Sequence, residues 1–251
     1  MIMKVSIVIP ARLASTRLPR KVLADINGRP MLWHVWKRAD KISFEKELFV
    51  ATDSVEVKKV VEGWGGSVIM TSPDCRSGTQ RIVSILPHLS GELILNVQGD
   101  EPLIDPQLLE EMVVQWKNSR PDLITAVYQI DNEEDLLDPN LVKVVRDENG
   151  YAIYFSRSTI PYLRDVPQEK WVQQHQYWGH IGVYGYARQT LIDYAKMNAG
   201  NLELAESLEQ LRFIEKNYRI HAVETDYSPI GVDTYNDLKK VRQILGGTGD
   251  E

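Results

Sequence analysis

Short β-branched apolar runs alternate with helix-like patterns through the first half of the chain, and this alternation limits the folds available to it. The first run covers residues 5–9 and ends at Pro10, and the next covers residues 48–52 and precedes a helical pattern over residues 54–65. Strands and helices that alternate in this way predict right-handed βαβ crossovers and a mainly parallel sheet covered on both faces. We therefore expect an α/β protein whose ligands lie beyond the carboxyl ends of its strands.

The other expected elements of the first half continue the alternation. Strands are predicted over residues 67–70 and 93–97, and helices over residues 30–39, 78–88 and 106–117. Ser54 is a plausible N-cap, because a serine hydroxyl can accept a hydrogen bond from the first turn of a helix.

The pattern changes after Asp122. Residues 141–146 and 151–155, joined by a polar turn that ends in Gly150, predict an antiparallel hairpin rather than another crossover. A strand is expected over residues 180–186, a helix over 202–215 with Leu204, Leu208 and Leu211 on one buried face, and a last helix from Asp233 or Thr234. We predict a single domain over residues 1–245 and a glycine-rich, disordered tail over 246–251.

Composition excludes several classes of protein. With 43% hydrophobic residues among 251, the chain can bury a large core, and no segment approaches the roughly 20 apolar residues of a membrane span. Cys75 is the single cysteine, which excludes an intrachain disulfide. The start of the chain has no signal-peptide pattern, so we expect a cytoplasmic protein without membrane insertion. The net charge of -6 gives no general basic field for nucleic acid.

One local cluster of positive charge stands out against this acidic background. The segment IPARLASTRLPRKVL, residues 9–23, carries Arg12, Arg17, Arg20 and Lys21 and no carboxylate, and it directly follows the first predicted strand. Cationic side chains and backbone amides after a strand, with small residues that permit close approach, suit a polyphosphate. The segment matches neither the P-loop nor the dinucleotide fingerprint. Phosphate binding is the favoured interpretation, and a solvated basic loop is the alternative.

This segment resembles the nucleotide-binding loop of the cytidylyltransferases that activate sugar acids, most closely of the 3-deoxy-manno-octulosonate cytidylyltransferase (CMP-Kdo synthetase) family. Seven further motifs follow in the family's order and extend the resemblance over nearly the whole chain: ATDS from Ala51, SGTQR from Ser77, NVQGDEPLI from Asn96, YAIYFSRSTIPY from Tyr151, HIGVYGY from His180, LEQLR from Leu208 and GVDT from Gly231. The resemblance implies a doubly wound nucleotidyltransferase (Rossmann-like) sheet with an inserted antiparallel portion, and a homodimer.

The resemblance also implies a function. It points to an enzyme that joins a 3-deoxy-ulosonic sugar acid to the CMP part of CTP, with release of pyrophosphate and with Mg²⁺ as cofactor, for outer-envelope polysaccharide (lipopolysaccharide) biosynthesis. Kdo is the expected acid, and 8-amino-Kdo, another sugar acid or another nucleotide remains open. A catalytically silent nucleotide-binding relative is the alternative from a different class, because a fold alone does not secure activity.

The residues carried over by resemblance form three groups. The catalytic group combines the cations of the first loop with two aspartates that would bind magnesium: Arg12, Arg17, Lys21, Asp100 and Asp233. The nucleotide-binding group is Pro10, Ala11, Arg12, Ser15, Arg17, Lys21, Ala51, Thr52, Asp53, Ser77, Gly78, Thr79 and Arg81. The sugar-binding group is Gln98, Arg157, His180, Tyr184, Glu209 and Gln210.

Several of these residues also have simpler structural interpretations. Asp100 could stabilise the turn after its strand, Asp233 could cap the last helix, and the polar residues from Ser77 could cap the helix that follows. His180 could be a hydrogen-bonded structural histidine. The tryptophans Trp33, Trp36 and Trp116 are expected in the core or a dimer interface.

Four positions depart from the family pattern: Arg20, Val22, Gln80 and Gly179. Arg20 could add a phosphate contact or stiffen its turn. Gly179 precedes His180, close to the inferred sugar pocket, and therefore leaves the acceptor open.

Overall fold

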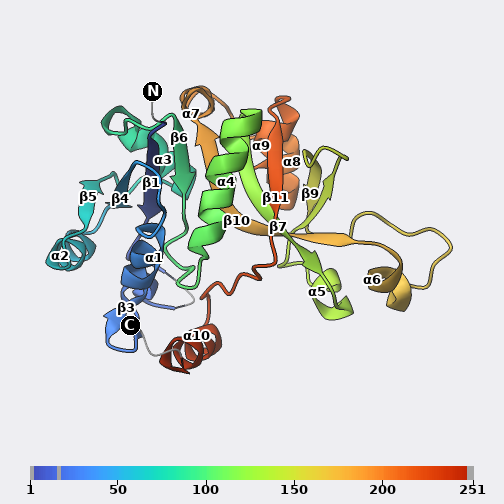
Figure 1. The fold of residues 1–251 in the computed structure, drawn as a ribbon, viewed down its shortest axis with the longest axis horizontal. Helices are drawn as coiled ribbons and strands as arrows, with labels where there is room; N and C mark the ends of the chain where they lie inside the picture. Colours follow the sequence, from blue (N-terminus) through green and yellow to red (C-terminus); the bar gives the residue numbers. More distant parts are fainter. Residues whose placement is uncertain (1–2, 16–17, 248–251) are drawn as a thin grey trace. The chain divides into compact units, whose positions relative to one another are not determined.

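A computed structural model describes residues 3–15 and 18–247, and the chain divides into two compact units. Unit 1 comprises Met1–Glu110 and Pro229–Glu251, and unit 2 comprises Glu111–Ser228. The division falls within helix α4 (Pro106–Ser119; Figure 1), because unit 1 runs to Glu110 and unit 2 begins at Glu111. The expectation of one domain over residues 1–245 stays a prediction.

Unit 1 contains a parallel sheet of four strands in the order β6 (Leu93–Asn96), β1 (Val5–Pro10), β4 (Lys46–Thr52) and β5 (Ser67–Met70). The connecting helices are α1 (Met31–Ala39), α2 (Val55–Gly63) and α3 (Gly78–Ile85), the last continued by a 3₁₀ turn, η2 (Leu86–His88). The chain steps outward from β1 to β4 and β5, then returns to β6 on the other side of β1. Right-handed crossovers therefore put α3 on the opposite face from α1 and α2, which is the doubly wound arrangement predicted.

Burial and capping explain why the predicted elements form here. Val5, Ile7, Val8 and Ile9 are all fully buried in β1, as a strand covered on both faces requires. The hydroxyl of Ser54 accepts a hydrogen bond from the backbone N–H of Val57 at 3.3 Å, which confirms it as the N-cap of α2.

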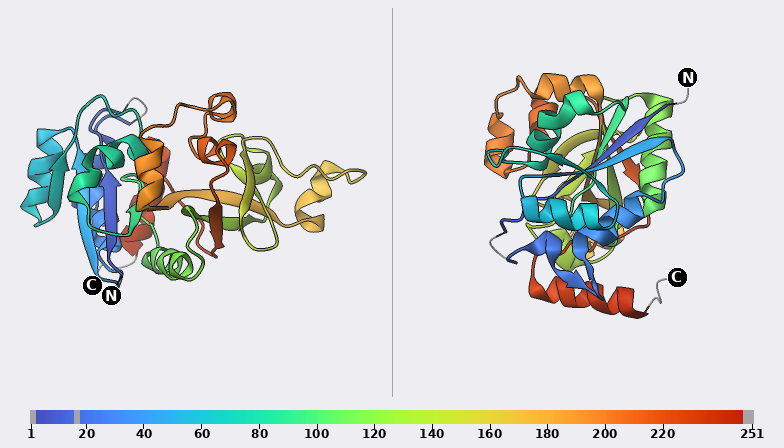
Figure 2. Two further views of the ribbon diagram at one scale, coloured as in Figure 1. Left: turned by 90° about the horizontal axis from the view of Figure 1, so that it is seen from above. Right: turned by 90° about the vertical axis from the view of Figure 1, so that its left-hand side faces the viewer.

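The rest of unit 1 consists of η1 (Lys21–Leu23), a small hairpin of β2 (Asp25–Ile26) and β3 (Arg29–Pro30), and helix α10 (Tyr235–Gly247). Helix α10 lies beside this hairpin (Figure 2), where the guanidinium of Arg242 donates two hydrogen bonds to the carbonyl of Asp25. Leu245 packs in a core cluster with Ile26. This packing keeps the last turn helical, so residues 246–247 belong to α10 rather than to a disordered tail, and residues 248–251 lie outside the described residues.

Unit 2 contains the antiparallel portion. Strand β7 (Leu123–Ile130) pairs antiparallel with β10 (Tyr177–Ala187) and parallel with β11 (Ile220–Glu224). The predicted hairpin is confirmed as β8 (Lys143–Arg146) and β9 (Ala152–Ser156), and β8 also pairs with β10. Short helical segments connect these strands: α5 (Glu133–Leu137), η3 (Gln168–Lys170), α6 (Trp171–Gln174), α7 (Arg188–Tyr194), α8 (Asn201–Glu206) and α9 (Leu211–Glu215).

The single helix expected over residues 202–215 is wrong. Ser207 adopts a left-handed conformation (φ 52°, ψ 47°), which ends α8, and the backbone N–H of Leu208 bonds to the carbonyl of Glu203 at 3.2 Å. The break also separates the expected buried face, because Leu208 and Leu211 are buried whereas Leu204 is 68% exposed.

Packing against a neighbouring strand explains why residue 179 is a glycine. Gly179 lies opposite Tyr128 in the β7–β10 ladder, and a Cβ added to it would lie 2.7 Å from the tyrosine ring. The departure from the family pattern at this position therefore accommodates an aromatic ring on the neighbouring strand.

Two tryptophans on the predicted helices differ in burial. Trp116 of α4 is 4% exposed, whereas Trp36 of α1 is half-buried and packs against Trp64 with ring centroids 6.4 Å apart. In the described part of the chain, no helix is both long enough and apolar enough to cross a membrane.

Candidate nucleotide and metal site

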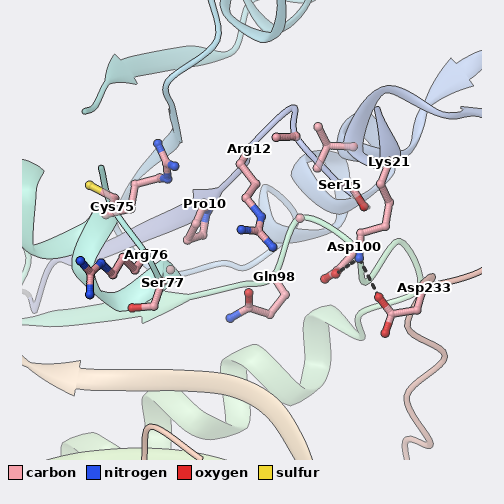
Figure 3. Close-up of a pocket in the computed structure, with 15 residues that line it drawn as sticks. Pro10, Arg12, Ser15, Lys21, Cys75, Arg76, Ser77, Gln98, Asp100 and Asp233 are labelled. Atoms are coloured by element: carbon pink, nitrogen blue, oxygen red, sulfur yellow. Dashed lines mark hydrogen bonds and ion pairs between the residues drawn. The ribbon is translucent and has the colours of Figure 1, made fainter. Parts of the chain in front are cut away.

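A cavity of about 260 Å³ lies at the carboxyl end of the parallel sheet in unit 1 (Figure 3). Pro10, the last residue of β1, and the segment from Gln98 to Asp100, just after β6, form part of its wall. This is the position at which an open α/β sheet binds its ligands. Its lining is Pro10, Arg12, Ala14, Ser15, Lys21, Val22, Cys75, Arg76, Ser77, Gly78, Arg81, Gln98, Gly99, Asp100 and Asp233.

The basic loop enters this cavity because its first residues are tied to the sheet. Pro10 pairs beside Ala51 in the β1–β4 ladder, and the N–H of Ala11 donates to the carbonyl of Ala51 at 2.8 Å. Arg12 is exposed, and in Figure 3 its side chain extends from the loop toward Gln98. A cation following a strand is thus presented to the cavity, as the sequence predicted.

Lys21 lies between the two aspartates. Its ammonium donates to Asp100 Oδ2 at 2.5 Å and to Asp233 Oδ1 at 2.9 Å (Figure 3). Burial disfavours the charged lysine, since its side chain is only 14% exposed, but the two carboxylates outweigh this and hold the pKa of Lys21 above its ordinary value. Lys21 is therefore a cation at neutral pH.

Other groups form the helix cap and the turn that the sequence offered as structural roles for the two aspartates. Thr234, not Asp233, is the cap of α10: its hydroxyl accepts from the N–H of Asp237 at 3.3 Å, and the Asp237 carboxylate accepts from the N–H of Thr234 at 2.8 Å. The turn after β6 is held by backbone bonds, such as Glu101 N–H to Gln98 carbonyl at 3.3 Å. The carboxylates of Asp100 and Asp233 consequently face Lys21 and the cavity.

A backbone hydrogen bond joins the two segments that carry the aspartates. The N–H of Val232 donates to the carbonyl of Asp100 at 2.9 Å. Beside them, burial and the charge of Asp100 raise the pKa of Glu101 to about 8, so this neighbour is neutral at pH 7 and adds no further negative charge.

The residues present fit a magnesium ion. Mg²⁺ in nucleotide enzymes is bound through one or two carboxylates together with phosphates and water rather than by a complete protein cage. Asp100 and Asp233 supply two carboxylates whose oxygens lie within 2.9 Å of one nitrogen, so both can reach a single ion. Within residues 3–15 and 18–247, no group of three or more His, Cys, Asp or Glu side chains is arranged to hold a metal.

The predicted nucleotide residues divide between the cavity wall and the layer behind it. Those on the wall are Pro10, Arg12, Ser15, Lys21, Ser77, Gly78 and Arg81, together with Gln98 of the predicted sugar group. Those outside the lining are Ala11, Ala51, Thr52, Asp53 and Thr79, and Arg17 lies outside the described residues. Their roles in binding stay predictions.

Arg81, on the cavity wall, is held by residues that lie behind the wall. Its guanidinium is buried, and it donates to Thr71 Oγ1 and forms an ion pair with Asp53 at 3.3 Å. Ser77 caps α3 by accepting from the N–H of Gln80 at 3.2 Å, so its structural interpretation is confirmed, and it also lines the cavity.

Sequence reasoning missed Arg76, which adds a further cation to the cavity wall. It follows Cys75 in an irregular polar segment without periodicity, and its charge was the one signal available. The backbone N–H of Arg76 donates to the side chain of Gln80 at 2.9 Å. Gln80, one of the four positions that depart from the family pattern, therefore has a local structural role.

The other two departures lie in the first loop. Arg20 has a left-handed backbone (φ 58°) and forms an ion pair with Glu56 of α2, which agrees with a stiffened turn. Val22 is 5% exposed and lines the cavity.

The predicted sugar residues of unit 2 have internal partners. His180 Nε2 lies 2.9 Å from Thr125 Oγ1, and the His180 ring packs against Phe155 and Tyr184 with centroids 5.2 and 5.3 Å apart. Burial lowers the pKa of His180 to about 3, so the ring is neutral. The structural interpretation of this histidine is thereby supported.

Arg157 and Glu209 also have internal partners, and Gln210 is buried. Arg157 donates to the carbonyls of Glu206 and Pro139 at 2.8 and 3.1 Å, and Glu209 accepts from the Tyr194 hydroxyl at 3.0 Å. Gln210 is 6% exposed and precedes α9. Their contact with a sugar acid stays a prediction.

Comparison with known proteins identifies the family. Residues 6–220 match the family model described as Cytidylyltransferase. The chain belongs to the cytidylyltransferase family. A 3-deoxy-manno-octulosonate cytidylyltransferase of Geobacter sulfurreducens is 45% identical, with 97% of this chain and 100% of that protein covered, and one of Geotalea uraniireducens is 44% identical, with 97% and 99% covered.

A solved cytidylyltransferase structure shares the fold closely. It is described as CMP:2-keto-3-deoxy-manno-octonic acid synthetase complexed with CTP, and it is 38% identical with a TM-score of 0.91 over 97% of this chain and 99% of that one. The nucleotidyltransferase fold expected from the resemblance is confirmed.

Proposed function

We propose that this cytidylyltransferase joins CMP from CTP to 3-deoxy-manno-octulosonate (Kdo) and releases pyrophosphate, with Mg²⁺ as cofactor. The observation that carries the proposal is the pair of aspartates, far apart in the sequence, that converge beside a cation-lined cavity at the carboxyl ends of β1 and β6. The names of the Geobacter and Geotalea relatives, which match over their whole lengths, supply the acceptor.

The residues of the first loop and of α3 would bind the nucleotide. Arg12, Lys21 and Arg76 line one cavity, and three cationic side chains can neutralise much of a triphosphate's charge. Ser77 and Gly78 begin α3 at the same wall, where the positive end of the helix favours an anion. The buried pair of Arg81 and Asp53 would fix the base end of the site.

The reaction brings one anion to another. The acceptor's hydroxyl oxygen forms a bond to the α-phosphorus, the bond from that phosphorus to the oxygen of the leaving pyrophosphate breaks, and the hydroxyl proton passes to solvent. Asp100 and Asp233 would hold the metal, which when bound neutralises charge and orients the reacting oxygens. The cationic side chains would position the triphosphate for in-line attack and stabilise pyrophosphate as it leaves.

A cytoplasmic location, a homodimer and a role in outer-envelope polysaccharide synthesis belong to the same proposal. The homodimer and the role in polysaccharide synthesis follow from the family resemblance.

The decisive experiment measures pyrophosphate release from CTP and Mg²⁺ with a panel of acceptors. Kdo, its 8-amino analogue and N-acetylneuraminate are compared, and the Asp100→Asn/Asp233→Asn double variant serves as the matched control. We expect rapid release with Kdo that the double variant lacks. If none of the three acids gives pyrophosphate release, the proposal is overturned in favour of a silent nucleotide-binding protein. If another acid is preferred to Kdo, the acceptor is reassigned.

A further inference from the structure

Lys21 occupies the position that a shared metal would need. Its ammonium contacts one oxygen of each aspartate, at 2.5 Å from Asp100 and 2.9 Å from Asp233. A magnesium ion held by the same two carboxylates would need the same small volume, because Mg²⁺ binds oxygen ligands at about 2.0–2.1 Å. The ammonium and the ion therefore compete for one place.

The charge of the pair explains why some cation is needed there. Two carboxylates converging on one point repel each other unless a cation lies between them. The side chains of Asp100 and Asp233 are 34% and 45% exposed, so water screens them only in part. With Lys21 in place, the pair is held at a distance that suits a metal.

Lys21 would also have a second partner within the proposed site. Its side chain lines the same cavity as Arg12 and Ser77, where the triphosphate would bind. A lysine ammonium on a flexible four-carbon stem can move between neighbouring anions, unlike the rigid guanidinium of an arginine. Phosphate oxygens could thus draw the ammonium away from the aspartates.

We propose that Lys21 is a placeholder cation: it holds Asp100 and Asp233 together in the nucleotide-free protein and must leave them before a divalent ion can bind. The inference rests on the proposed function for the identity of the incoming groups. It makes nucleotide and metal binding cooperative, because the nucleotide that withdraws the lysine vacates the metal position.

The test measures Mn²⁺ binding to the full-length, nucleotide-free protein by the electron paramagnetic resonance signal of free Mn²⁺. If Lys21 is a placeholder, Lys21→Met should bind Mn²⁺ at least ten-fold more tightly than the wild type. The double variant Lys21→Met/Asp233→Asn should lose that gain. If Lys21 only binds phosphate, its removal leaves Mn²⁺ affinity unchanged.

Arg12→Met is the matched control, because Arg12 carries the same charge in the same cavity while its side chain extends toward Gln98 (Figure 3). We expect its Mn²⁺ affinity to stay within two-fold of the wild type. An equal gain in Arg12→Met, or no gain in Lys21→Met, overturns the inference. If Lys21→Met does not fold, Lys21→Gln tests the same point, because its amide can still donate to one carboxylate without a charge.

The outcome is separable from that of the proposed function. If the wild type turns over CTP and Kdo but Lys21→Met binds Mn²⁺ no more tightly than the wild type, only the placeholder role is overturned. A Mn²⁺ gain without turnover of any acid removes the proposed function while leaving the competition between lysine and metal established.

Discussion

The cavity of unit 1 and the aromatic cluster around His180 in unit 2 both carry motifs of the same family, yet their side chains are held in opposite ways. Around Lys21 the charged atoms of three residues face a cavity, and the lysine stays ionised beside two carboxylates. Around His180 the polar atoms bond inward to Thr125, and burial keeps the ring neutral. The two groups of motif residues therefore differ in where their polar atoms point: toward a cavity around Lys21, and toward an internal partner around His180.

The largest effect is expected at the aspartate pair. Asp100→Asn and Asp233→Asn should each lower turnover by two or more orders of magnitude, because each removes the charge of a metal ligand. Steady-state pyrophosphate release measures this. Asp40→Asn, an exposed aspartate just after α1, is the control and should keep wild-type turnover. Near-normal rates in either ligand variant would contradict the assigned role.

In unit 2 a charge removal should affect stability rather than catalysis. Arg212 forms a two-fold ion pair with Glu203, with both contacts at 2.6 Å and only 9% and 13% of the side chains exposed. Arg212→Met leaves a largely buried carboxylate without its cation and should lower the free energy of unfolding by about 3 kcal/mol. Urea denaturation measures the change.

The control for Arg212 is Arg219→Met. Arg219 is exposed and stacks on Tyr151 at 3.8 Å, so we expect a loss below about 1 kcal/mol. Equal losses in the two variants would show that burial does not distinguish these arginines.

The neutral His180 predicts a pH dependence of stability. Its pKa of about 3 in the folded chain lies below the ordinary value of 6.5, so the unfolded chain binds more protons between these two pH values and stability rises with pH across that window. His180→Gln, which can keep a hydrogen bond to Thr125, should remove about 1 kcal/mol of the stability loss between pH 6 and pH 5. His175→Gln, at an exposed histidine, is the control substitution measured under the same conditions.

Much of the fold could be predicted because local patterns agree with tertiary burial. The β-branched run of β1 and the serine caps of α2 and α3 are short-range signals, and the structure confirms them. The error at residues 202–215 arose because leucine spacing favours one continuous helix. Ser207 takes a left-handed conformation, which a serine in the sequence does not predict.

The candidate site was harder to predict from residue patterns alone. Asp100 and Asp233 are far apart in the sequence, and the segments that carry them are joined by the hydrogen bond from Val232 to Asp100, a long-range contact with no local signature. Family motifs pointed to the pair and to Lys21, but not to the position of Lys21 between the two aspartates or to Arg76 on the wall. Side-chain partners depend on packing, which motif order does not specify.

The smallest effect is expected at Arg20. Its exposed ion pair with Glu56 contributes little, and a glycine would relieve the left-handed backbone, so the two changes oppose each other. Arg20→Gly should alter the free energy of unfolding by less than about 0.5 kcal/mol, as measured by urea denaturation. A loss much larger than this would indicate that the pair with α2 fixes the loop that carries Lys21.

The most direct measurement of the central claim is the anomalous diffraction of manganese in crystals of the protein grown with Mn²⁺ and CTP. The account predicts one manganese ion bonded to oxygens of both Asp100 and Asp233, with the ammonium of Lys21 moved to the triphosphate. Manganese bound to phosphate oxygens alone, with Lys21 still between the two aspartates, would contradict it.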